Sequence, residues 1–169
     1  MRELSYTTRQ IPNDDLGDPK LVRLLAYWNS RRFGRDLPKR RDLLPEEMGE
    51  MLGRIALVDV GAQANGFRFR LFGTKLPFAI GDDLHNRGLD ELEPAAHRQV
   101  IDALFRAALD SQAPLCREIE ASAGERRFTY RALVLPVSND GDGADMLLFA
   151  CSWAQDEVPL DDPLRQDVL

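Results

Sequence analysis

The sequence predicts a single α+β domain built on an antiparallel sheet, and three observations lead to this prediction. The chain has 169 residues, of which 44% are hydrophobic and 30% charged, enough apolar content for one core. Stretches of alternating apolar and polar residues indicate strands, whereas apolar residues at helical spacing indicate helices. The expected order is helix, helix, two strands, short helices, long helix and three strands, which is typical of helices and strands in separate layers.

The chain divides into four predicted segments. Residues 1–17 are predicted to be a flexible tail, residues 18–53 an N-terminal helical extension, residues 54–154 the core and residues 155–169 an acidic tail. Asp18-Pro19 starts the first helix, because Asp is a capping residue and Pro suits the first helical position. A short second helix is expected from Pro45, and a long one from Pro94 to about Gln112.

Five strands are expected in the core. The first two form a hairpin, closed by a tight turn at Asn65-Gly66 or by a wider loop from Gly61. Gly124 and the "NDGDG" stretch separate the last three. The expected ranges are 54–60, 67–72, 114–122, 126–138 and 145–154.

Both possible hairpin registers give the same facing, because they differ by an even shift. One face carries Arg68 and Arg70, and we interpret these as outward charges of an edge strand. In the wider-loop register Asp59 lies opposite Arg68, which favours an exposed ion pair. The other face is entirely apolar and is expected to face the long helix: Ala56, Val58, Val60, Phe67, Phe69 and Leu71.

The order of the predicted elements resembles the PAS fold. Several sequence stretches also resemble a PAS-like family of small, stand-alone bacterial proteins. The resemblance covers roughly residues 18–154. It implies a five-stranded antiparallel sheet of order 2-1-5-4-3, with helices on one face and an extra N-terminal helix. It also implies a sensory or adaptor role, and it does not imply a catalytic residue. The matching stretches are "LLAYWNSRRFGRDLPKRRDLLPEEM", "LVDV", "GFRFRLFGT", "GDDLHNRGLDEL" and "ALVLPVSNDGDGADMLL".

A ligand pocket between the sheet and the helices is one hypothesis for this apolar face. Such a lining suits a small apolar or aromatic ligand, with the Tyr130 hydroxyl as its polar contact. The competing interpretation is that the same side chains simply fill a core. The candidate lining residues are Phe69, Leu71, Phe78, Leu104, Phe128, Tyr130 and Leu148.

The last two strands are apolar on both faces, so the sheet needs a second cover. The N-terminal helix or another subunit has to supply it. We expect a homodimer that uses this outer face, and a monomer at micromolar concentration would count against it. The candidate interface residues are Leu21, Leu25, Trp28, Leu133 and Leu135.

Charge and motifs argue against several function classes. A net charge of −6 argues against a nucleic-acid binder, and the absence of a long apolar run or a signal-peptide pattern favours the cytoplasm. Cys116 and Cys151 are too few for a metal cluster or a disulfide framework.

His97 lies on the apolar side of the long helix, where a haem-binding PAS domain places its ligand, but a satisfied or exposed histidine is the better interpretation. We expect no cofactor, no metal and no catalytic residue, and an enzyme is the weaker alternative.

The basic connector, residues 31–41, is the basis of a further hypothesis, an anion site. Arg31 and Arg35 resemble the arginine pair of cyclic-dinucleotide-binding PilZ domains, but the companion Asp-x-Ser-x-x-Gly pattern is absent from the sequence. The simpler interpretation is a solvated linker.

Taken together, the sequence favours a non-catalytic sensor or adaptor that acts through protein contacts. Its expected partners are a histidine kinase or another PAS protein, with no nucleic acid and no membrane. The alternative is a small cone-shaped enzyme of isomerase or dehydratase type, and an inward-facing carboxylate or histidine would favour it.

Overall fold

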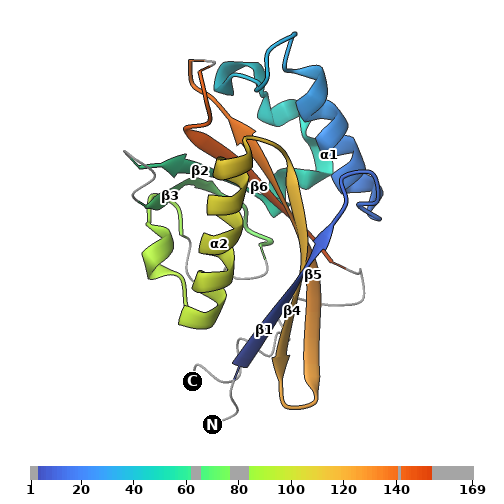
Figure 1. Cartoon of the computed structure of the whole chain (residues 1–169), viewed down its shortest axis with the longest axis vertical. Helices are drawn as coiled ribbons and strands as arrows, with labels where there is room; N and C mark the ends of the chain where they lie inside the picture. The colour runs from blue at the N-terminus through green and yellow to red at the C-terminus, as the bar shows by residue number, and fades with distance from the viewer. Residues whose placement is uncertain (1–3, 62–65, 77–83, 141, 154–169) are drawn as a thin grey trace.

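The computed structural model describes residues 4–61, 66–76, 84–140 and 142–153 (Figure 1). Within them lie six strands, two α-helices and four short 3₁₀ helices. In chain order these are β1 Leu4–Ile11, α1 Pro19–Ser30, η1 Arg40–Asp42, η2 Pro45–Glu47, η3 Gly49–Arg54, β2 Ile55–Val60, β3 Phe67–Phe72, η5 Leu89–Glu91, α2 Ala95–Ser111, β4 Leu115–Ala123, β5 Arg126–Val137 and β6 Met146–Ser152.

All six strands belong to one antiparallel sheet of order β1-β4-β5-β6-β2-β3. The α+β class and the predicted order of the five later strands are confirmed. The expected number of five strands is wrong, because β1 adds a sixth beside β4, with Leu4 opposite Ala123 and Ile11 opposite Cys116.

The prediction of a flexible tail is therefore wrong for residues 4–11. Most of the β1 side chains are exposed, and Ile11 is the one buried side chain of the strand. A strand with so few apolar contacts gains much of its stability from backbone hydrogen bonds to its neighbour. The sequence carries no signal for such a pairing when the partner lies more than 100 residues away.

Both faces of the sheet are covered within the chain, as the apolar pattern requires. Helix α2 packs across β1, β4 and β5, and it buries one aromatic-rich cluster that includes Phe69, Phe105 and Phe149. Helix α1 and the segment that runs from it to η3 pack on the other face, against β5 and β6. They bury a second cluster, the α1-side cluster, which includes Leu21, Trp28 and Leu133. Figure 1 shows α1 beside the sheet, away from α2, with the turn-rich segment that follows it at the top of the view.

The predicted starts of both α-helices and the predicted end of α2 are confirmed. The backbone N–H of Lys20 donates to the Asp18 side chain at 2.8 Å, and Pro19 occupies the first position of α1. Helix α2 follows Pro94 and ends at Ser111, and the next residue, Gln112, has the left-handed conformation common after helix ends (φ 54°).

The predicted facing of β3 is wrong at its end because of a β-bulge. Val58 pairs with Phe69, but Leu57 pairs with Leu71, which leaves Arg70 as the extra residue. Beyond the bulge the side chains exchange faces, so Phe72 packs against the α2-side cluster and Leu71 is 37% exposed. The wider-loop register is the observed one, with the Gly61 N–H donating to the Gly66 carbonyl and Asp59 opposite Arg68.

Candidate functional site

The predicted pocket residues fall into three groups. Phe69, Leu104, Phe128 and Tyr130 are buried in the α2-side cluster, and Phe69 has edge-to-face contacts with Phe72 and Phe105 at 5.2 and 6.5 Å. Leu71 and Leu148 lie toward the opposite face, the latter in the α1-side cluster, so their placement in this pocket is wrong. Phe78 lies outside the described residues. The four residues of the first group thus pack as a core, and ligand binding by them stays a prediction.

A buried polar pair lies inside this core. Nε2 of His97 is 2.5 Å from the Tyr130 hydroxyl oxygen, and the Tyr6 ring stacks on the imidazole with centroids 4.7 Å apart. His97 is 0% exposed, and its burial lowers its pKa to about 3, so the ring is neutral at physiological pH. From sequence we interpreted His97 as satisfied or exposed; the structure shows it buried, with Nε2 hydrogen-bonded to Tyr130.

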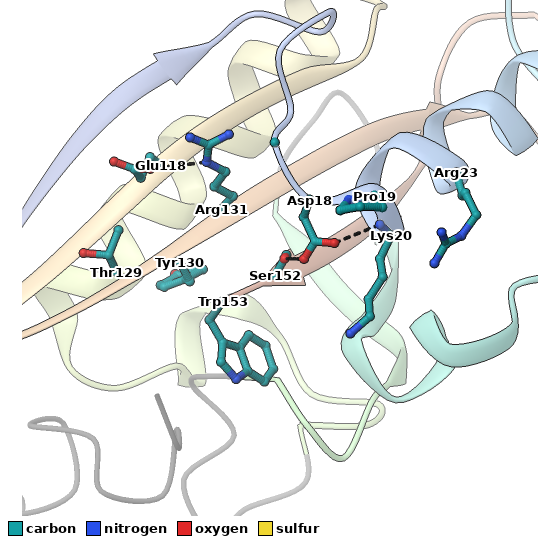
Figure 2. A pocket seen from close by; sticks show the side chains of 11 residues that line it. Asp18, Pro19, Lys20, Arg23, Glu118, Thr129, Tyr130, Arg131, Ser152 and Trp153 are labelled. Carbon is teal, nitrogen blue, oxygen red and sulfur yellow. Dashed lines mark hydrogen bonds and ion pairs between the residues drawn. The ribbon is translucent and has the colours of Figure 1, made fainter. Parts of the chain in front are cut away.

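A hollow of about 720 Å³ lies where the start of α1 meets the first half of β5 and the end of β6 (Figure 2). Tyr130 and Trp153 belong to its wall, and both also contact the α2-side cluster. The remaining wall comes from the β1–α1 connection, α1 and the α1-facing side of the strands. Its lining residues are Gly17, Asp18, Pro19, Lys20, Arg23, Glu118, Thr129, Tyr130, Arg131, Ser152 and Trp153.

Two side chains fasten the start of α1 to the sheet at this hollow. The Asp18 carboxylate caps α1 with one oxygen and accepts a hydrogen bond from the Ser152 hydroxyl with the other (Figure 2). The Arg131 guanidinium donates to the carbonyl of Leu16 at 2.6 Å and to that of Asp15 at 3.3 Å. Displacement of α1 from the sheet therefore breaks contacts at the wall of the hollow.

Glu118 joins this arrangement to the edge of the sheet. It accepts from Arg9 of β1 at 3.0 Å and from Arg131 of β5 at 3.2 Å. The hydrogen bond from Arg9, with a smaller contribution from Arg131, lowers the pKa of the Glu118 carboxyl. The Glu118 carboxylate thus binds one arginine on each of the two strands beside β4.

The predicted interface residues mostly lie inside the chain. Leu21 and Trp28 of α1 are buried against the sheet face that carries Leu133 and Leu135, and Leu25 is half-buried beside them. The indole N–H of Trp28 donates to the Pro136 carbonyl at 2.8 Å. The second cover that the sequence required is thus supplied by the chain's own helix.

The arginines singled out from sequence have protein partners. Arg31 forms an ion pair with Glu47, and Arg35 forms one with Asp42 at 2.6 Å. Asp59 forms its ion pair with Arg70 at 2.9 Å rather than with Arg68, which donates to the Asn86 carbonyl at 2.5 Å. A ligand phosphate at Arg31 and Arg35 would have to displace two carboxylates, which disfavours the anion-site hypothesis.

Within the described part of the chain, no three His, Cys, Asp or Glu side chains gather as a metal site would require. No helix there is long and apolar enough to cross a membrane.

The sequence offered little signal for the hollow itself. Asp18 was identified from its capping position alone, whereas Lys20, Ser152 and Trp153 belong to no motif. They meet because β6 ends against the start of α1, a contact between segments more than 130 residues apart. Sequence periodicity describes one element at a time and does not predict such a meeting.

Comparison with known proteins decides the family. A protein-family model described as a PAS domain matches residues 17–151, which is most of the chain. The chain belongs to the PAS domain family. The resemblance noted from sequence is thereby confirmed, and PAS domains are in general sensory modules. No curated protein matches the chain.

Proposed function

We propose that this PAS domain is a non-catalytic sensor or adaptor in bacterial signalling, which binds a small ligand in the hollow beside α1 and acts through contacts with another protein. One observation carries the proposal. The wall of the hollow contains both Trp153 and Tyr130, which contact the α2-side core, and Asp18 and Ser152, which hold α1 to the sheet. A molecule bound there touches the core and the attachment of the helix at once.

The lining favours a small, mainly aromatic ligand with a polar end. The half-buried Trp153 ring offers an apolar surface, although the Arg54 guanidinium already lies over it at 4.2 Å from the ring centroid. The side chains of Lys20 and Thr129 offer a cation and a hydroxyl at the same wall. This ligand class agrees with the sequence prediction, but its place is the hollow rather than the aromatic core.

Thermal unfolding of the full chain with a panel of small aromatic and short acyl compounds tests this site. A stabilising compound binds the folded state, so its shift of Tm rises with concentration. We expect Trp153→Ala to abolish the shift and Val22→Ser, on the exposed face of α1, to keep it. A panel without any shift would contradict the ligand part of the proposal.

The partner class follows from the family resemblance. We propose a histidine kinase or another PAS protein in the cytoplasm. A homodimer through Leu133 and Leu135 requires α1 to leave the sheet, because α1 covers these residues. Sedimentation at micromolar concentration tests the dimer, and a monomer would contradict it.

A second candidate function is the small isomerase or dehydratase, and one observation favours it. His97 faces into the interior and contacts the Tyr130 hydroxyl, a pairing that acid–base chemistry can use. Against it, His97 is 0% exposed and is covered by Tyr6. The test is the exchange of substrate protons with solvent. Exchange that the parent chain catalyses and that His97→Gln does not would establish the isomerase or dehydratase.

A further inference from the structure

Phe33 is an exposed aromatic side chain in a strained backbone conformation. Its φ of 50° lies in the left-handed region, which is rare for a bulky residue, and its side chain is 59% exposed. Gly34 continues the turn with a φ of 81°. Because the strained turn holds an apolar ring in water, neither local conformation nor core packing explains the residue, and such sites are often functional.

Two guanidinium groups hold the position of this ring. Those of Arg31 and Arg35 lie 6.0 and 5.8 Å from its centroid. Each is fixed in turn by a carboxylate, Arg31 by Glu47 and Arg35 by Asp42. The ring and its cations are therefore presented as one ordered surface, which reduces the entropy lost when another molecule binds.

The surrounding segment is basic in an otherwise acidic chain. Residues 31–42 carry six basic and two acidic side chains, a net charge of +4, while the whole chain carries −6. Arg41 is exposed, and its neighbour Asp42 contacts Arg35. An exposed aromatic ring with arginines is also the composition that dominates binding energy at protein interfaces.

We infer that Phe33 and the basic segment 31–42 form the surface through which this domain binds a partner protein, and that the partner presents an apolar pocket bordered by carboxylates. The inference rests on the proposed function, since it assumes that output passes through protein contacts. Arg31 and Arg35 are already paired with carboxylates, so the charge that selects an acidic partner comes from the other basic residues of the segment, among them the exposed Arg41. The same charge also disfavours a second copy joined symmetrically at this surface, because that contact would place arginines against arginines.

Site-specific photo-crosslinking of the full chain in its native cell gives the first test. The crosslinking residue replaces Phe33, and in separate experiments it replaces Leu52 and Leu71, which are also exposed apolar residues. We expect a crosslinked protein from position 33 whose attached peptide has a net negative charge. Crosslinks from the control positions alone would overturn the surface but keep the adaptor role, and no crosslink from any position would contradict both.

Binding of the purified partner gives the second test. Phe33→Gly removes the ring and also relieves the positive φ, so we expect at least about a tenfold loss of affinity with no loss of Tm. Affinity should also fall about tenfold between about 50 and 200 mM salt, because the contact is charged. Val22→Ser should bind normally. Unchanged affinity of Phe33→Gly, a peptide without acidic residues, or a crosslink only to lipid would overturn the inference.

Discussion

The hydroxyl oxygen of Tyr130 lies 2.5 Å from Nε2 of His97, inside a core where both side chains are almost wholly buried. This hydrogen bond joins α2 to the middle of the sheet, and the stacked ring of Tyr6 adds β1 to the same cluster. The strand that the sequence did not predict is therefore tied to the buried histidine.

This burial predicts that the protein loses stability at mildly acidic pH. The pKa of His97 is about 3 in the folded state, against about 6.5 for an ordinary histidine. Between these values the unfolded state binds more protons, so the contribution of His97 to the free energy of unfolding falls as pH drops from 6.5 toward 3. From pH 7.5 to 5.0 we expect a loss of about 2 kcal/mol from this residue.

Urea unfolding at both pH values measures the effect. His97→Gln should remove most of the fall, because Gln can still bond to the Tyr130 hydroxyl but does not titrate. His85→Gln, at the exposed second histidine, should behave as the parent chain. An undiminished fall in His97→Gln would show that other groups cause it.

The β-bulge at Arg70 predicts an unequal effect at two neighbouring residues. Phe72→Ala should reduce the free energy of unfolding by about 2 kcal/mol, because Phe72 contacts the α2-side cluster. Leu71→Ala should cost at most about 1 kcal/mol, because this side chain is 37% exposed. Denaturant unfolding of both variants measures the difference, and a larger loss at Leu71 would restore the facing predicted without a bulge.

Gly73 predicts a steric effect just after β3. A Cβ atom at this position would lie 2.3 Å from the Gly53 carbonyl oxygen and 2.8 Å from that of Ile55, and neither backbone atom can move easily. We expect Gly73→Ala to cost about 2–3 kcal/mol in urea unfolding. Gly53→Ala is the matched control, since its nearest neighbour is a flexible Lys75 atom at 3.4 Å. Equal losses in the two variants would contradict the close approach of these backbones.

The two cysteines are expected to be unreactive in the folded protein. Burial raises the pKa of the Cys116 thiol to about 12, and burial also raises the pKa of Cys151 well above its ordinary value. Only the thiolate reacts readily, so labelling by a disulfide reagent should be at least about a thousand-fold faster in urea than in buffer. Val22→Cys, at an exposed position, should label at once in buffer and report on the reagent. Rapid labelling of the parent chain in buffer would contradict the burial of both thiols.

Features that depend on neighbouring residues could be predicted from the sequence. Asp18-Pro19 and Pro94 mark the helix starts because capping and proline geometry act within one turn. Alternation predicted the strands, and the apolar character of both faces of β6 predicted two covers for the sheet.

Contacts between distant segments became known only from the folded structure. It paired the polar β1 with β4, placed the bulge at Arg70 and brought Ser152 to Asp18. It also placed the chain's own α1 over the outer face of the sheet. Each choice compares the free energies of whole alternative packings, and the local pattern of residues is the same in all of them.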